Sequence, residues 1–498
     1  MTQANAQDRP TVLRRALPRK PVARPRIRLQ LPELGGAWVV GFILFEVVCQ
    51  LALLFPFATS LRVPLRSAPF LGSIVLLMLL PRRAFRDLHP SVRAGVCVVL
   101  IVCASLAHPH TNTALSAAAT VAMYLAILAP LVWAGGLEID QKWLKRAILC
   151  LWTFSTLSAL VGVGQTLRPN WQWLQPNLSA VVQAHNDAGE GLKISLASGA
   201  LVFRPMGLSD QPGGAAGAGM CCVVFGLALL VADRRNWMRA VVLGSMVLGL
   251  YCIYLSQVRS VLIMTAVCIV AFCVVMALRG EFSRMIRALA ALAGVVLVAT
   301  VWAVRVGGET VTGRLATLVE ESPTMVYYRN RGFFLEYTLR VYVPTYPCGA
   351  GLGRWGMMNY YFGDPDDPNS EPLWAEIMWT GWVFDGGVPL TIAYTAAVLI
   401  AVWQARKIGV RRGGGDLGLW ASVICAYNLG ALAVTFNYSF FMGQGGLDFW
   451  LLNACLFAAA RRAPTMRPLV APRGFENFAP PRSLVMPQPG WNAPEART

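Results

Sequence analysis

The chain has 498 residues, of which 56% are hydrophobic and 14% are charged, and its mean hydropathy is +0.53. A soluble globular domain carries about 25% charged residues, so the composition excludes an ordinary soluble enzyme and predicts an integral membrane protein. The formal net charge of +18 would suggest nucleic acid for a soluble protein. In a membrane protein, lysine and arginine instead report which side of the bilayer a loop faces, so we expect no nucleic-acid partner.

The two ends of the sequence differ from its apolar middle. Residues 1–33 form a basic segment rich in proline and arginine, and a full-length apolar run follows it directly, so we expect an uncleaved cytoplasmic tail. Residues 463–498 contain eight prolines and no apolar period, which predicts a disordered cytoplasmic tail. The polytopic membrane domain is expected over residues 34–462.

Apolar runs predict twelve membrane-spanning helices and an all-α fold. They begin near Gly36, Phe70, Gly95, Ala114, Ala147, Gly214, Met238, Ser260, Ala288, Gly386, Asp416 and Phe440. Of the 43 lysines and arginines, 31 lie in the tails and the even-numbered connections, and 12 lie in the odd-numbered connections. Because basic residues favour the cytoplasmic side, both termini are expected in the cytoplasm of a bacterial inner membrane.

Two long segments are expected on the outer side, at residues 167–213 and 306–385. A chain that only had to span the membrane would not need them, so function is expected there. The second is rich in tyrosine, tryptophan and arginine, a composition typical of the membrane interface.

Four arginines in outward-facing contexts are candidates for binding a phosphate group. Arg204 precedes the sixth span, Arg259 stands between spans seven and eight, and Arg329 and Arg331 lie in the second long loop. Guanidinium groups hold phosphate oxygens in a bidentate manner. The alternative for each one is an arginine that merely extends its head to the lipid headgroups.

The second long loop also contains a glycine-rich stretch, residues 349–356, and an acidic stretch, residues 363–371. The first has a formal GxGxxG pattern without a strand or helix beside it, so close backbone packing is a better interpretation than a dinucleotide site. Asp364, Asp366 and Asp367 are expected in a solvated turn, with a divalent-cation site as the lesser alternative.

Glu371 and Glu376 are candidate general bases. They precede the tenth span in what the pattern indicates is a helix that re-enters the membrane, where partial burial would raise the pKa of a carboxyl group. Glu46 and Asp448 are acids within predicted spans one and twelve. Such acids keep a transporter function open as an alternative.

The chain resembles the bacterial O-antigen ligase and O-antigen or exopolysaccharide polymerase family. Four patterns in order carry the resemblance: Arg204-Pro-Met-Gly207, Ser256-Gln-Val-Arg259-Ser260, Pro347-Cys-Gly-Ala-Gly-Leu-Gly353, and Ser370-Glu371 with Gly381 downstream. Together they cover about residues 200–400. In the ligase branch a histidine begins the last pattern, whereas Ser370 stands here, and this difference favours the polymerases over the ligases.

The resemblance implies a glycosyltransferase that uses a polyprenyl-diphosphate-linked oligosaccharide donor and acts without a metal or other cofactor. It implies that Arg204, Arg259, Arg329 and Arg331 bind the diphosphate, and that a carboxylate such as Glu371 or Glu376 deprotonates the acceptor hydroxyl. Membrane lipid and a chain-length regulator are the implied partners. A ligase that moves glycan to another acceptor, and a lipid-linked glycan transporter, are the alternatives.

The charge distribution predicts the outcome of cysteine labelling. A membrane-impermeant thiol reagent added from the periplasm should label cysteines placed at Asn186 and Asp366 but not one placed at Arg411, because only the first two lie in predicted outer loops. The opposite pattern would put the candidate arginines on the wrong side of the membrane.

Overall fold

The computed structural model describes residues 35–55, 58–80, 87–168, 171, 193–195, 199, 201–210, 213–233, 235–320, 322–411 and 415–463. Both expected tails, apart from residue 463, lie outside these ranges. The described chain is a helical bundle with one small antiparallel sheet, formed by β1 (Lys193–Ser195) and β2 (Leu201–Phe203). The expectation of an all-α membrane protein is confirmed at this level.

Ten helices within the described ranges are long and apolar enough to cross a membrane. They are α1 (Gly35–Ala52), α2 (Ala58–Leu79), α4 (Ala114–Leu128) continued by α5 (Pro130–Gly136), α6 (Gln141–Leu167), α8 (Gly214–Ala232), α9 (Asn236–Ser256), α10 (Arg259–Arg279), α11 (Phe282–Glu320), α16 (Met378–Gly409) and α17 (Gly415–Val434). Two further helices, α3 (Ser91–Ala104) and α18 (Gln444–Arg462), occupy the places predicted for spans three and twelve. The first is short, and the second contains polar residues such as Asn453.

The start of α2 differs most from its prediction. This helix begins at Ala58, well before the predicted Phe70, and it continues through Pro64 and Pro69. Arginines and prolines in its first turns lower the hydropathy there, which hides the helix from an apolar-run criterion. As a result, two arginines that were expected in a loop lie on the helix instead.

The first half of α16 also differs from its prediction. The span was expected to start at Gly386, but the helix begins at Met378 and bends at Gly386 and Gly387. Gly387 has a φ of 65°, and an added Cβ there would lie 2.1 Å from the carbonyl oxygen of Pro347. That oxygen accepts a hydrogen bond of 2.9 Å from the backbone N–H of Val388. The glycine-rich stretch that follows Pro347 is therefore packed against the bend.

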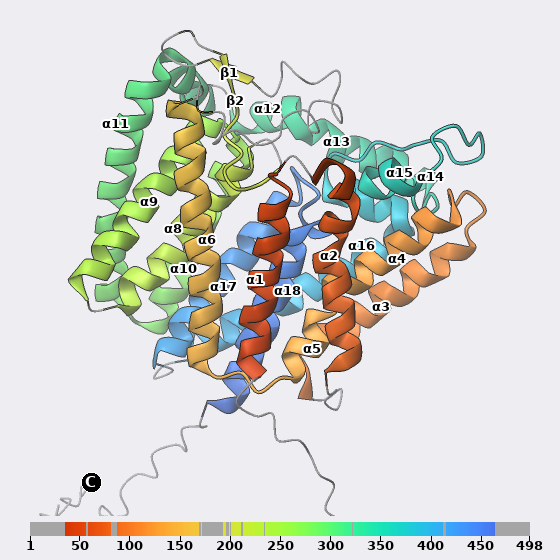
Figure 1. Cartoon of the computed structure of the whole chain (residues 1–498), viewed down its shortest axis with the longest axis horizontal. Coiled ribbons are helices and arrows are strands. Elements are labelled where there is room, and N and C mark those ends of the chain that lie inside the picture. The colour runs from red at the N-terminus through yellow and green to blue at the C-terminus, as the bar shows by residue number, and fades with distance from the viewer. Residues whose placement is uncertain are drawn as a thin grey trace, which may run out of the picture.

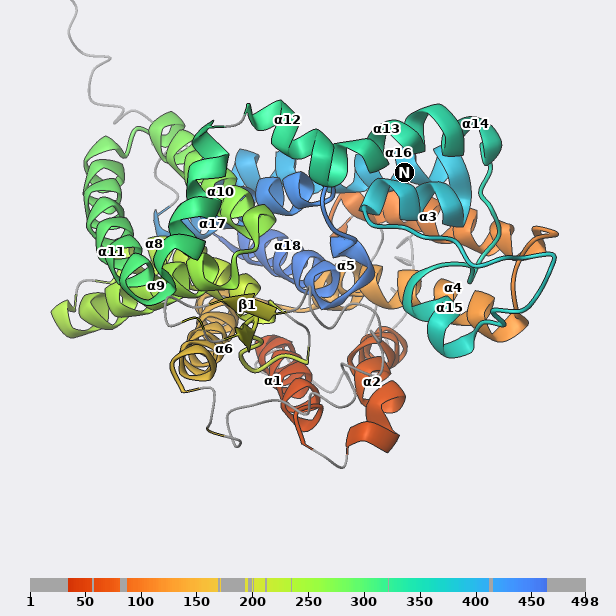
Figure 2. The ribbon, with the colours of Figure 1, turned by 90° about the horizontal axis from the view of Figure 1, so that it is seen from above.

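Most of the second long loop is helical. The helix α11 extends past a bend at Gly308, and short elements follow it: α12 (Pro323–Tyr327), α13 (Phe333–Tyr337), α14 (Val343–Thr345) and α15 (Gly356–Phe362), with π-helical turns on either side of α13. Figure 1 shows these short helices and the sheet at the same end of the bundle. Seen from above, α12 to α14 run along one edge and α1 and α2 lie along the opposite edge (Figure 2).

The last helix, α18, is at the centre of the packing. It contacts α4, α5, α6, α16 and α17. Asn453 on α18 and Asn428 on α17 exchange two side-chain hydrogen bonds of 2.7 and 2.9 Å, and Trp450 donates to the hydroxyl of Tyr394 at 3.1 Å. Amide groups buried among apolar helices must pair with each other, so this pair fixes the register of the two helices.

The bend in α16 predicts a difference between two glycine substitutions. Gly387→Ala should cost about 1–3 kcal/mol from backbone strain alone, before the clash with Pro347, and should lower the melting temperature of the purified protein. Gly294→Ala on α11 is the control, because an added Cβ there meets nothing within 4 Å. Equal melting temperatures for the two variants would contradict this account of the bend.

Candidate functional site

Two arginines of α2 meet one aspartate at the end of the bundle that carries the sheet. Arg66 donates to Oδ2 of Asp210 through Nε at 2.9 Å and also through Nη2, and Arg62 donates to the same oxygen at 3.3 Å. The second terminal nitrogen of Arg66 donates to the hydroxyl of Tyr361 on α15 at 3.1 Å. Two guanidinium groups and one carboxylate leave one net positive charge, so the cluster can attract an anion.

The segment that supplies Asp210 is held by α6. The side-chain oxygen of Gln165 accepts hydrogen bonds from the backbone N–H groups of Met206 and Gly207 at 3.0 and 2.9 Å. Its amide nitrogen donates to the Gly207 carbonyl at 3.1 Å. Gly207 has a φ of 66°, and an added Cβ would lie 2.5 Å from Oγ of Ser158, so a glycine is required at this close approach.

Arg204 begins the same segment and is half-buried. Burial lowers the pKa of its guanidinium group. Its Nε atom, like that of Arg62 on α2, is buried without a hydrogen-bond partner among the described residues. Buried donors without an acceptor are costly, so each of these two N–H groups could donate favourably to an anionic ligand.

The turn between α9 and α10 lies against this segment. An added Cβ on Gly213, the residue before α8, would be 3.1 Å from a methyl group of Val258. Gln257 has a left-handed φ of 56°, which turns the chain so that Arg259 starts α10. The backbone N–H of Ala215 also donates to the Pro205 carbonyl at 3.4 Å, so the Arg204 and Arg259 patterns both lie beside the start of α8, although they are far apart in sequence.

Arg331 lies elsewhere. It forms an ion pair with Glu376, whose Oε1 also accepts a hydrogen bond of 3.2 Å from Nε1 of Trp374. A carboxylate paired with a guanidinium is a weaker base. No contact joins Arg331 to Arg66 within the described ranges. The side chain of Arg329 lies outside the described residues.

Glu371 is exposed, which corrects the expectation of a partly buried carboxyl group. The expected re-entering helix also starts later than predicted: residues 371–375 are not helical, and α16 begins only at Met378. The local shape comes from Arg354, whose guanidinium donates to the Glu371 carbonyl at 3.0 and 2.9 Å. Those bonds hold the backbone in a loop and leave the carboxylate of Glu371 in solvent.

The glycine-rich and acidic stretches pack against the loop between α3 and α4. An added Cβ on Gly351 would lie 2.2 Å from the His110 carbonyl oxygen, which confirms close backbone packing there. Asn112 donates to Oγ of Ser370 at 2.7 Å, and Nδ1 of His110 lies 2.9 Å from the Asn369 carbonyl oxygen. Sequence reasoning did not connect His110 with this segment, because the two are far apart in the chain.

The aspartates of the acidic stretch form turns. Asp364 accepts a hydrogen bond from the backbone N–H of Asp366, and Asp367 accepts one from that of Asn369, each at 3.0 Å. Hydrogen bonds from Ser370 and Asn369 lower the pKa of the Asp367 carboxyl group. The turn interpretation is confirmed, and the described residues contain no group of three or more His, Cys, Asp or Glu side chains that could hold a metal ion.

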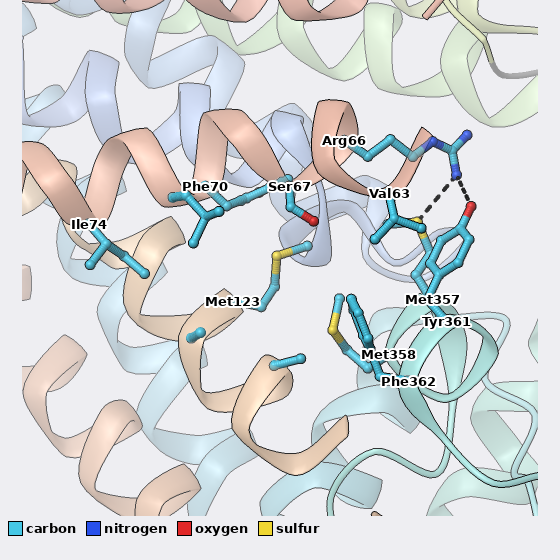
Figure 3. Close-up of a pocket in the computed structure, with 13 residues that line it drawn as sticks. Val63, Arg66, Ser67, Phe70, Ile74, Met123, Met357, Met358, Tyr361 and Phe362 are labelled. Atoms are coloured by element: carbon cyan, nitrogen blue, oxygen red, sulfur yellow. Dashed lines mark hydrogen bonds between the residues drawn. The ribbon is translucent and has the colours of Figure 1, made fainter. Parts of the chain in front are cut away.

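An apolar cavity of about 230 Å³ begins at Arg66 and runs between α2, α4 and α15. Figure 3 shows Arg66 beside Tyr361 at one end, with Phe70, Ile74 and Met123 further along the cavity. The other residues that line it are Val63, Ser67, Leu71, Ala119, Ala122, Met357, Met358 and Phe362. A long apolar group with a negatively charged head fits this combination of surfaces.

No protein-family model matches the chain, and no curated protein matches it.

The hydrogen bonds of Gln165 predict that a substitution there makes residues 204–210 less ordered. Gln165→Leu removes the acceptor of two backbone N–H groups, each of which costs about 1–3 kcal/mol if left buried and unpaired. Amide hydrogen exchange of residues 204–210 should become faster, while exchange in α17 should not change. Equal protection of residues 204–210 in both proteins would show that another contact holds the segment.

Proposed function

We propose that this protein is a membrane glycosyltransferase that polymerises polysaccharide by transferring glycan from a polyprenyl diphosphate to an acceptor sugar hydroxyl. The reaction takes place at the periplasmic face of a bacterial inner membrane. In this proposal α3 and α18 complete twelve spans, and both termini are cytoplasmic. The single observation that carries the proposal is the apolar cavity with Arg66 at one end.

The cavity suits the start of a polyprenyl chain. Its volume of about 230 Å³ is below the roughly 300–1,000 Å³ of a typical small-molecule site, so it would enclose only the first part of a long lipid. The remainder of the lipid would lie in the bilayer beside α2. Only 11% of the apolar stretch of this helix is buried in the protein. A lipid substrate thus explains why an outer helix borders an apolar cavity.

The arginines suit the diphosphate. Glycosyl transfer from a lipid diphosphate releases a diphosphate leaving group, whose growing negative charge is stabilised by guanidinium groups that are already in place. Arg66 lines the cavity, Arg62 shares the Asp210 carboxylate with it, and Asp210 belongs to the segment that begins at Arg204. In this proposal the diphosphate takes over part of the hydrogen bonding that Asp210 now receives, and Arg259 completes the diphosphate site. Arg331 lies apart from Arg66 and is proposed to contact the donor elsewhere.

The acceptor hydroxyl must lose a proton. Glu371 is the proposed base, because its carboxylate is exposed and has no arginine partner in the described structure. Glu376 is proposed to position Arg331 through their ion pair. The glycan acceptor is a growing chain in the polymerase, and another molecule in the ligase alternative, which shares every other feature of this proposal.

The arginine proposal predicts a graded loss of product. Arg66→Lys keeps the charge but loses the planar fork, so polymer formed per cell should fall about 10- to 100-fold, as expected for one or two lost charge-assisted hydrogen bonds. Arg259→Lys should impair polymer in the same direction. The matched control is Arg340→Lys, because Arg340 is 77% exposed and pairs only within its own helical turn.

These strains are compared at equal amounts of membrane-inserted protein. Unchanged polymer from an Arg66→Ala strain would remove Arg66 from the site and would leave the apolar cavity without a role in donor binding.

The base proposal predicts a difference between two amide variants. Glu371→Gln should lower turnover by about 10²–10⁴, the size expected for lost general-base catalysis, while donor binding stays intact. Glu376→Gln should weaken donor binding more than turnover, because it releases Arg331. Full activity of both variants, measured with purified protein and lipid-linked donor, would mean that neither carboxylate is required.

A further inference from the structure

Two acidic side chains meet inside the bundle, on helices from opposite ends of the sequence. Glu46 lies on α1 and is 1% exposed, and Asp448 lies in the second turn of α18. Their carboxyl groups are close enough to form a hydrogen bond with each other. Both oxygens of Glu46 and Oδ1 of Asp448 are buried, and no donor among the described residues forms a hydrogen bond to them.

Within the described part of the chain, neither acid of this pair forms an ion pair with a lysine or an arginine. The titratable groups that face it are Cys49 on α1, Cys221 on α8 and Tyr427 on α17, all of which are uncharged in their ordinary form at neutral pH. Two unit negative charges 4 Å apart repel by about 4 kcal/mol even at an effective dielectric constant of 20. In addition, two carboxyl groups can hydrogen-bond only if one of them carries a proton. The pair therefore holds a proton at neutral pH.

A second cavity gives this proton a route to water. It has a volume of about 80 Å³, which is enough for water molecules, and Glu46, Arg66 and Asp210 all line it. Gln50 and Gln444 add polar groups to the lining. The same cavity therefore connects Glu46 with the arginine cluster.

A metal ion is a poorer occupant than a proton. Calcium takes six to eight oxygen ligands and magnesium requires an octahedral set, whereas this pair offers two carboxyl groups. Broken helices can add backbone carbonyls to an ion site in a membrane protein. Here α1 and α18 are unbroken at Glu46 and Asp448, so their carbonyl oxygens are used in helical hydrogen bonds.

We propose that Glu46 and Asp448 form a proton-binding site that holds one shared proton at neutral pH and exchanges it through the cavity leading to Arg66 and Asp210. The negative charge rests mainly on Asp448, because the amino-terminal turns of α18 place a positive helix dipole beside it. Glu46 lies in the middle of α1 and carries the proton. This proposal does not rest on the glycosyltransferase function, because it concerns a site that is occupied without any substrate.

Infrared spectroscopy of the full-length protein in lipid bilayers tests the proposal directly. The difference spectrum of the wild type minus Glu46→Gln, at neutral pH, should contain the carbonyl stretch of one protonated carboxyl group. Glutamine matches the shape of a protonated glutamate and can donate to Asp448, so the variant should fold. The matched control is Glu336→Gln, whose glutamate pairs with Arg340 at the surface and should give no such band.

Asp448→Asn provides an independent measurement. It should keep the Glu46 band but shift it, because the hydrogen bond from Glu46 to a carboxylate is lost. Absence of the band from the wild type minus Glu46→Gln spectrum, or an unshifted band in Asp448→Asn, would overturn the proposal. A band that appears only after sodium ions are replaced by a bulky organic cation would also overturn it and would identify the pair as a cation site.

Discussion

The arrangement of this protein's candidate site depends on one ion pair, between the guanidinium groups of α2 and the carboxylate of Asp210. It joins three parts of the chain: the start of an outer helix, the segment before α8, and α15 through Tyr361. All three groups are largely shielded from water, with 11–19% of the Arg62, Arg66 and Asp210 side chains exposed. In such surroundings, removal of one partner leaves the other as an uncompensated buried charge, which is strongly destabilising.

Arg66 lines two cavities of different character. One is the apolar cavity between α2, α4 and α15, and the other is the smaller cavity that Asp210 and Glu46 also line. A ligand with an apolar tail and an anionic head would place the head at Arg66. That head would compete with Asp210 for the guanidinium group. Because Asp210 also lines the smaller cavity, its displacement would change the lining of the cavity that Glu46 shares.

Apolar periodicity predicted the bundle well where it was uninterrupted. The start of α8 at Gly214 agrees with its prediction, and α10 starts one residue from its own. It failed at α2, because Arg62, Pro64 and Arg66 lower the local hydropathy although Asp210 compensates the arginines in the folded chain. It also mistook residues 371–375 for a helix, since the hydrogen bonds from Arg354 that hold the Glu371 backbone in a loop come from a different segment of the chain.

The candidate site was predictable only in part. The patterns around Arg204 and Arg259 identified segments that pack together, through Gly213 and Val258. The contribution of α2 and the meeting of Glu46 with Asp448 were not predictable from one sequence, because each joins residues that are far apart in the chain and that share no local pattern. Whether such a side chain is an isolated charge or part of a site depends on which residues the fold places beside it, and not on its residue type alone.

We propose that a polyprenyl diphosphate binds with its head at Arg66 and its chain in the apolar cavity. Photo-crosslinking of the purified protein with a polyprenyl diphosphate that carries a photoreactive group early in its chain tests this binding mode. Adducts are expected on residues of α2, α4 and α15, including Met123, and excess diphosphate lipid should remove them while neutral polyprenol should not. Adducts confined to other helices, or equal competition by the neutral lipid, would contradict it.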